Sequence, residues 1–205
     1  MKFRDNFLKI EYCRVFFILL PFFVLSLHLS IMALTLSESD FIIMTGLMLG
    51  YILPPAGKET VIPLGIALGI PWWSVALSII LVDLETALFM AFNFDYVHRL
   101  PILGPLIRDL TNTTEDMIAR HQWLTGLYAL GVILMVMVPV LGSGGVRGSI
   151  AGRLLGLTPI QTFLAIAIGA SIGCFGIALG ADQILSYLCA TGLLSPDIFI
   201  RVCPG

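Results

Sequence analysis

Charged residues are scarce in this chain. They make up 12% of its 205 residues, whereas soluble domains carry about a quarter. Hydrophobic residues make up 58%, and a soluble protein of this size could not hide them, because much of its surface stays exposed. The composition therefore excludes a soluble globular domain and predicts an all-α integral membrane protein that crosses the bilayer several times.

Several chemical signatures are also missing. The net charge of −2 offers no basic surface to nucleic acid. The sequence contains no hydrolase motif, phosphate-binding loop or His/Cys cluster, so we predict no enzyme, no metal site and no cofactor. The four cysteines show neither metal-ligand spacing nor a disulfide framework. Cys189 and Cys203 could still pair if the C-terminus faces an oxidising compartment.

Three apolar stretches are long enough to cross a bilayer, which takes about 20 residues. They are Val15–Leu34, Trp72–Phe94 and Pro159–Ala181. Basic residues precede the first stretch, as in a signal peptide, but its length and the lack of a small-x-small cleavage site favour a retained helix with a cytoplasmic N-terminus. A shorter apolar stretch, Ile184–Leu194, is predicted to form a peripheral helix.

Two further apolar regions are interrupted, the first by a polar turn at Pro54–Glu59 and the second by a glycine-rich turn at Gly142–Gly145. Each turn separates two short arms. The arms are Phe41–Leu53, Thr60–Ile70, Leu124–Val138 and Val146–Leu157. At a rise of about 1.5 Å per residue, no arm spans a hydrocarbon core of about 30 Å. We therefore predict two re-entrant helical hairpins, with one kinked spanning helix per region as the alternative.

The two halves resemble each other at an offset of 87 residues, which relates Gly57 to Gly144 and Asp95 to Asp182. A cytoplasmic N-terminus places the basic residues of the polar loop on the same side, as the positive-inside rule requires. The hairpins then enter from opposite leaflets as an inverted repeat, and their tips meet near the midplane. The predicted parts of this single plasma-membrane domain are a helix at 1–38, the first repeat at 39–94, a cytoplasmic loop at 95–122, the second repeat at 123–181 and a C-terminal segment at 182–205.

Six charged side chains fall within the apolar zone, where each costs roughly 2.5–3.5 kcal/mol unless it is paired, hydrated or used. They are Lys58, Glu59, Asp83, Glu85, Arg147 and Arg153. Their charges sum to zero, so internal ion pairing is one interpretation and a polar cavity between the hairpins is the other. Glu59, Asp83 and Glu85 are candidate proton carriers, and Glu85 is also expected to pair with a neighbour.

The hairpin tips have the features of an anion site, because helix N-termini there would present free backbone N–H groups and a positive dipole end. The candidate substrate-binding residues are Lys58, Glu59, Gly142, Ser143, Gly144, Gly145, Arg147, Ser149 and Arg153. A second group of glycines is predicted to permit close helix packing. These are Gly65, Gly69, Gly152 and Gly156. His28 is expected to be a helix-contact residue.

Two segments resemble the signature regions of the small multidrug export protein family. They read GKETVIPLGIALGIP (residues 57–71) and VPVLGSGGVRGSIAGRLLGL (residues 138–157), and the resemblance extends over residues 41–181. That family is similar in plan to the DedA/VTT membrane proteins, which have two opposed re-entrant hairpins. The resemblance implies a transporter: DedA-type relatives are associated with movement of polyprenyl phosphate or phospholipid and with the proton-motive force.

The predicted function is therefore a non-enzymatic transporter or flippase of an anionic lipid phosphate, with proton coupling as an option. The alternatives are a proton-coupled exporter of small cationic drugs, which would use Glu59, Asp83 and Glu85, and a structural scaffold. The expected partners are membrane lipids, a lipid-phosphate or small-molecule substrate, protons and, through exposed small-residue faces, a second copy of the chain. Nucleic acid and cofactors are not expected.

Overall fold

The computed structural model describes residues 2–52, 56–94, 123–138 and 144–193, and the described part is built from α-helices. Three helices are long. They are α1 (Lys2–Thr35), α4 (Trp72–Asn93) and α8 (Pro159–Ala190). Four are short. They are α2 (Glu38–Ile52), α3 (Lys58–Ala67), α6 (Trp123–Met137) and α7 (Gly145–Leu154).

The three long helices are the described ones with the length and hydropathy to cross a membrane, over Val15–Thr35, Trp72–Asn93 and Pro159–Ala190. This confirms the expected spans in position. Two bounds differ from the prediction. Helix α1 already begins at Lys2, because the polar residues before Val15 include good helix formers such as lysine, arginine and glutamate.

Helix α8 corrects the prediction of a span that ends near Ala181 and a separate helix at Ile184–Leu194. The structure has one continuous helix to Ala190. No proline interrupts this stretch, and a single glycine inside a helix costs only about 1 kcal/mol. The helix ends where Gly192 adopts a positive φ of 68°.

The short helices α3 and α7 match each other at the predicted offset of 87 residues. Each has 10 residues, and each follows a glycine with extended backbone, Gly57 or Gly144. Each also ends in the same way: the N–H groups of Gly69 and Ile70 donate to the carbonyls of Ile66 and Gly65, and the equivalent pair in α7 repeats this pattern. The local repeat that the sequence suggested is therefore present in the backbone.

Positive φ angles at the two helix ends correct the role predicted for two of the glycines. Gly69 has a φ of 87° and Gly156 a φ of 74°, a conformation that strongly favours glycine. These residues terminate helices. By contrast, a Cβ at Gly65 would lie 3.0 Å from Leu47, and one at Gly152 would lie 2.7 Å from Thr162, which confirms that these two permit close packing.

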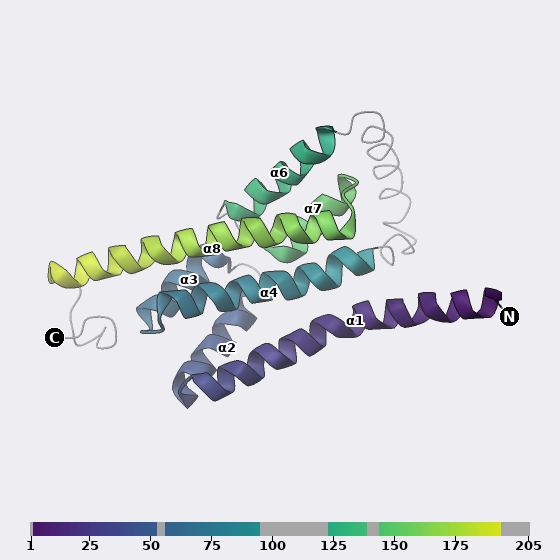
Figure 1. The fold of residues 1–205 in the computed structure, drawn as a ribbon. Coiled ribbons are helices and arrows are strands. Elements are labelled where there is room, and N and C mark those ends of the chain that lie inside the picture. Colours follow the sequence, from purple (N-terminus) through teal and green to yellow (C-terminus); the bar gives the residue numbers. More distant parts are fainter. Residues whose placement is uncertain (1, 53–55, 95–122, 139–143, 194–205) are drawn as a thin grey trace.

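Helices α4 and α8 lie side by side and run in opposite directions (Figure 1). The α2–α3 pair follows the C-terminal end of α1 and leads into the start of α4. The α6–α7 pair begins at the other end of the molecule and leads into the start of α8 (Figure 1). The two short-helix pairs therefore approach the middle of α4 and α8 from opposite ends.

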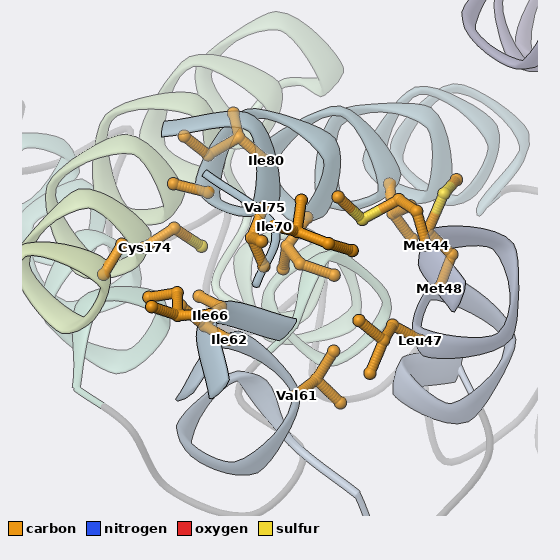
Figure 2. Packing of buried hydrophobic residues seen from close by; sticks show 14 of the residues in the cluster. Met44, Leu47, Met48, Val61, Ile62, Ile66, Ile70, Val75, Ile80 and Cys174 are labelled. Carbon is orange, nitrogen blue, oxygen red and sulfur yellow. The ribbon is translucent and has the colours of Figure 1, made fainter. Parts of the chain in front are cut away.

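Two apolar clusters hold these elements together. The first joins α2, α3 and the first half of α4, and it includes Cys174 and Ala178 of α8 (Figure 2). The second joins α6, α8 and the turn that follows α7, through Leu155 and Leu157, and it includes Ala87 of α4. The offset of 87 relates Ala87 to Cys174, so each long helix contributes an equivalent position to the cluster of the other half.

Helix α6 packs very closely on α8. A Cβ at Gly169 would lie 2.6 Å from the carbonyl oxygen of Ile133, and one at Gly173 would lie 2.6 Å from that of Met137. Close backbone approach at small residues is a usual basis of helix association in membranes. Lipid tails are as apolar as the helix surfaces, so no hydrophobic effect drives the helices together. This contact holds the C-terminal end of α6 against α8, and the second short-helix pair meets the first near that end.

Candidate functional site where the short-helix pairs meet

Asp83 lies at the middle of α4 and is fully buried. Its Oδ1 accepts a hydrogen bond of 2.7 Å from the hydroxyl of Tyr51, in the last turn of α2. The same oxygen accepts a hydrogen bond of 2.7 Å from the backbone N–H of Gly145, the first residue of α7. One carboxylate thus links the two short-helix pairs.

Lys58, the first residue of α3, completes the group and is 1% exposed. Its Nζ lies 3.7 Å from Oδ2 of Asp83 and donates a hydrogen bond to the carbonyl oxygen of Val136. Val136 is in the last turn of α6, where carbonyl groups have no partner within the helix. We call Tyr51, Lys58, Asp83 and Gly145 the Asp83 cluster; its ion pair confirms the internal pairing that the sequence suggested.

The carboxylate of Asp83 serves as the anion at the N-terminus of α7. The residue before the helix, Gly144, has no side chain to cap it, and the first N–H groups of a helix need an external acceptor. The positive dipole end of α7 also favours a negative charge at this point. The sequence predicted an anion here and assigned it to a substrate; in the structure, the chain supplies the anion itself.

The atoms around Gly144 and Gly145 leave no room for a side chain at either position. A Cβ at Gly145 would lie 2.2 Å from the carbonyl oxygen of Asp83, and one at Gly144 would lie 2.6 Å from the Tyr51 hydroxyl. Direct approach of the backbone to Asp83 therefore depends on both residues being glycine. Gly142 and Ser143, also predicted to bind substrate, lie outside the described residues.

Glu59 folds back over the turn that precedes α3. A Cβ at Gly57 would lie 2.2 Å from its Oε1. Both carboxylate oxygens are buried, and neither accepts a hydrogen bond from the described residues. A buried carboxylate without donors is costly when ionised, so Glu59 is chemically distinct from Asp83, which receives two hydrogen bonds.

The remaining predicted binding residues lie on α7. Arg147 is exposed. Ser149 is buried and donates a hydrogen bond of 2.6 Å to the carbonyl of Gly145. Arg153 is in the last turn, where it donates to the carbonyl of Leu157 at 2.8 Å and lies 5.7 Å from the centre of the Phe94 ring. The structure thus brings Lys58, Gly144, Gly145 and Asp83 together and places Arg153 at the other end of α7.

Glu85 belongs to a second buried pair, on a different face of α4. Its Oε1 lies 3.1 Å from Nδ1 of His28 in α1. Both side chains are almost fully buried, with 6% exposure for His28 and 7% for Glu85. The pair confirms two expectations: that Glu85 pairs with a neighbour and that His28 is a helix-contact residue.

Sequence reasoning missed Tyr51, which makes the strongest side-chain contact to Asp83. The signal was a tyrosine in an otherwise apolar arm, since a buried tyrosine hydroxyl usually needs a partner. Within the described segments, no three His, Cys, Asp or Glu side chains gather into a metal site. Cys189 forms a disulfide, and Cys203 lies outside the described residues, so their pairing stays a prediction.

Long apolar helices around a small buried polar cluster define an integral membrane protein. Residues 59–190 match the model of the family described as "Putative small multi-drug export protein". The match covers more than half of the chain, which therefore belongs to this family of membrane export proteins. Comparisons with curated proteins and with solved structures found no significant match.

Proposed function

We propose that this chain is a proton-coupled transporter, or flippase, for an anionic lipid phosphate such as polyprenyl phosphate or phospholipid. The observation that supports the proposal is the convergence of an ammonium group, a helix N-terminus and a hydroxyl on one carboxylate, Asp83. These are the groups that bind phosphate in proteins. In this proposal, Asp83 occupies the substrate's place while no substrate is bound.

Exchange between Asp83 and the phosphate gives a simple coupling scheme. When Asp83 takes up a proton, its carboxyl no longer neutralises Lys58, and the N–H of Gly145 becomes available to the phosphate. When the phosphate leaves, Asp83 loses the proton and returns to the same donors. Glu59, whose buried oxygens accept no hydrogen bond from the described residues, and Glu85 are the further candidate proton carriers in this scheme.

The remaining tip residues would hold the head group in this proposal. Arg147 is exposed two residues beyond Gly145, and its planar guanidinium suits a phosphate. The family match supports export as the activity, and the lipid bilayer as the source of the substrate is part of this proposal. Gly142, Ser143 and Ser149 are retained as secondary contacts, whereas Arg153, in the last turn of α7, is not. The scheme requires no cofactor and no covalent chemistry.

We further propose that the short-helix pairs are re-entrant hairpins that form an inverted repeat in the plasma membrane, with a cytoplasmic N-terminus. Helix α3 has 10 residues, about 15 Å, which is half of a hydrocarbon core. The approach of the pairs from opposite ends supports opposed entry (Figure 1). Rocking of the two halves would then alternate access to the Asp83 cluster. Gly176 and Gly180, both with open space, offer a face for a homodimer.

Transport of a labelled polyprenyl phosphate in proteoliposomes tests the function. Arg147→Gln should lower the rate about tenfold or more, because a hydrogen bond to a charged group contributes roughly 1.5–3 kcal/mol. Asp83→Asn should leave Lys58 and Gly145 available to the phosphate at any pH. Movement should then continue but no longer respond to an imposed proton gradient.

The matched substrate control is a labelled polyprenol without phosphate, whose movement Arg147→Gln should not change. Unchanged phosphate movement in Arg147→Gln would reject the role of Arg147. Full proton dependence in Asp83→Asn would reject the exchange scheme. Each variant must be shown to be folded in the proteoliposomes at the assay temperature, by its circular dichroism spectrum, before the rates are compared.

A further inference from the structure

Helices α1, α2 and α4 border a cavity of about 350 Å³, with Val146 of α7 at one edge. Its size is at the lower end of the range for small-molecule sites, about 300–1,000 Å³. Two of the lining side chains, Phe22 and Leu49, are 59% and 58% exposed on the outside of the helices. The cavity therefore opens toward the hydrocarbon core of the bilayer. Its walls include Phe22, Leu25, Leu29, Met48, Leu49 and Phe89.

The polar side chains in the lining each have a partner within the protein. The hydroxyls of Thr45 and Thr86 donate to backbone carbonyls one turn earlier in their own helices, at 2.8 and 2.9 Å. Oε1 of Glu85 contacts Nδ1 of His28 at 3.1 Å. The surface of the cavity is therefore almost entirely apolar. Such a surface suits a hydrocarbon chain and leaves the hydrogen-bonding groups of a polar ligand without partners.

The inner end of the cavity borders the Asp83 cluster. Three lining residues are immediate sequence neighbours of cluster members. They are Ile52, Val82 and Val146, next to Tyr51, Asp83 and Gly145. These neighbours come from three different helices, α2, α4 and α7, so the cavity adjoins the cluster in space and not along one stretch of sequence. A cluster of anion-binding groups and an apolar cavity with a common border fit a ligand that has a charged head and an apolar body.

We infer that this cavity holds the hydrocarbon chain of the lipid phosphate, and that it admits a single chain. The inference rests on the proposed function, because it takes the Asp83 cluster as the place of the phosphate. The chain leaves the head group past Val146, lies between the walls of α1, α2 and α4, and continues into the bilayer. A volume of about 350 Å³ leaves no room for a second chain, so the site selects a single-chain lipid phosphate over a diacyl phospholipid.

Photo-crosslinking to the full chain in lipid nanodiscs locates the hydrocarbon chain. The probe is a single-chain alkyl phosphate with a diazirine in its chain, and the control probe is the corresponding alcohol. Mass spectrometry of the labelled peptides should place the phosphate probe on Leu25, Leu29, Met48 or Leu49. Labelling of these residues by the alcohol should be about tenfold weaker, because the alcohol lacks the charged group that binds at the Asp83 cluster.

Two tryptophan substitutions of matched exposure test the cavity itself. Leu49 lines the cavity and is 58% exposed, whereas Ile172 of α8 is 54% exposed and is not part of the lining. Leu49→Trp should fold, intrude into the cavity and lower labelling by the phosphate probe about fivefold or more. Ile172→Trp should leave the labelling unchanged. Phosphatidic acid, which has two chains, should compete with the probe about tenfold less well than an unlabelled single-chain alkyl phosphate.

The labelling experiment and the transport assay can fail separately. Equal labelling by the alcohol would overturn the inference, since the cavity would then take any chain of the bilayer. Unchanged labelling in Leu49→Trp, or equal competition by phosphatidic acid, would also overturn it. Movement of polyprenyl phosphate in proteoliposomes without labelling of the cavity would support the proposed function and reject this chain site. Labelling as expected without such movement would support the chain site and reject transport.

Discussion

At Asp83, one side chain satisfies groups from three other helices. Tyr51, Lys58 and Gly145 come from α2, α3 and α7, and all reach the same carboxylate of α4. A buried ion pair adds little net stability, because desolvation offsets most of the attraction. Removal of one partner is costly, however, since the other charge is left buried. The cluster therefore fixes how the helix pairs meet more than it stabilises the protein.

A double-mutant cycle tests this at residue scale. Lys58→Met and Asp83→Asn should each lower the free energy of unfolding, by about 3–5 kcal/mol where a lone charge stays buried. The double variant should lose clearly less than the sum, because no unpaired charge remains. Reversible unfolding in bicelles measures the three values.

The control for that cycle combines Asp83→Asn with Glu38→Gln. Glu38 is exposed at the start of α2, so this pair should be additive within about 0.5 kcal/mol. An additive Lys58–Asp83 cycle would show that the two side chains do not interact in the membrane-embedded protein.

At the scale of the element, helices α3 and α7 end in the same way. Gly69 and Gly156 both have positive φ and close equivalent hydrogen bonds. The sequence showed both glycines but could not distinguish termination from packing, because both roles favour a missing side chain. The distinction depends on the backbone angle, which the residue type permits but does not impose.

A substitution at Gly156 tests its role in helix termination. Gly156→Ala should destabilise the protein by about 1–2 kcal/mol, the cost of a left-handed conformation for a residue with a Cβ. Gly131→Ala in α6, where a Cβ meets open space, should be neutral or stabilise by up to about 1 kcal/mol. Thermal unfolding followed by circular dichroism compares the two. Equal behaviour of both variants would contradict the termination role.

At the scale of the whole molecule, the α4–α8 pair is the frame on which two similar halves meet. Ala87 and Cys174 occupy equivalent positions, and each packs into the cluster of the opposite half. The halves are not chemically equivalent, however. The offset of 87 pairs Lys58 with Gly145, so one half contributes a cation and the other a helix N-terminus to the same carboxylate.

Cysteine labelling tests how this arrangement lies in the membrane. In a background without native cysteines, Ala56→Cys and Val146→Cys should resist a membrane-impermeant maleimide added to intact cells, because both positions would lie within the bilayer. Ser37→Cys, exposed between α1 and α2, should react readily from outside. Labelling at positions 56 and 146 as fast as at 37 would contradict re-entrant hairpins.

The sequence by itself determined the class of protein, the positions of the long spans and the match of α3 with α7 at an offset of 87 residues. These properties follow from composition, from the length needed to cross a bilayer, and from glycine and proline at helix ends, all of which are local. It also identified the embedded charges, because each is an exception to its surroundings.

Only the tertiary structure decided which of these charges meet. Asp83 and Glu85 are two residues apart, yet one faces Lys58 and the other faces His28. Successive positions on a helix point in different directions, and the partner of each depends on how neighbouring helices are rotated and displaced. That packing is set by glycine contacts such as those of Gly169 and Gly173, which a single sequence does not assign to partners.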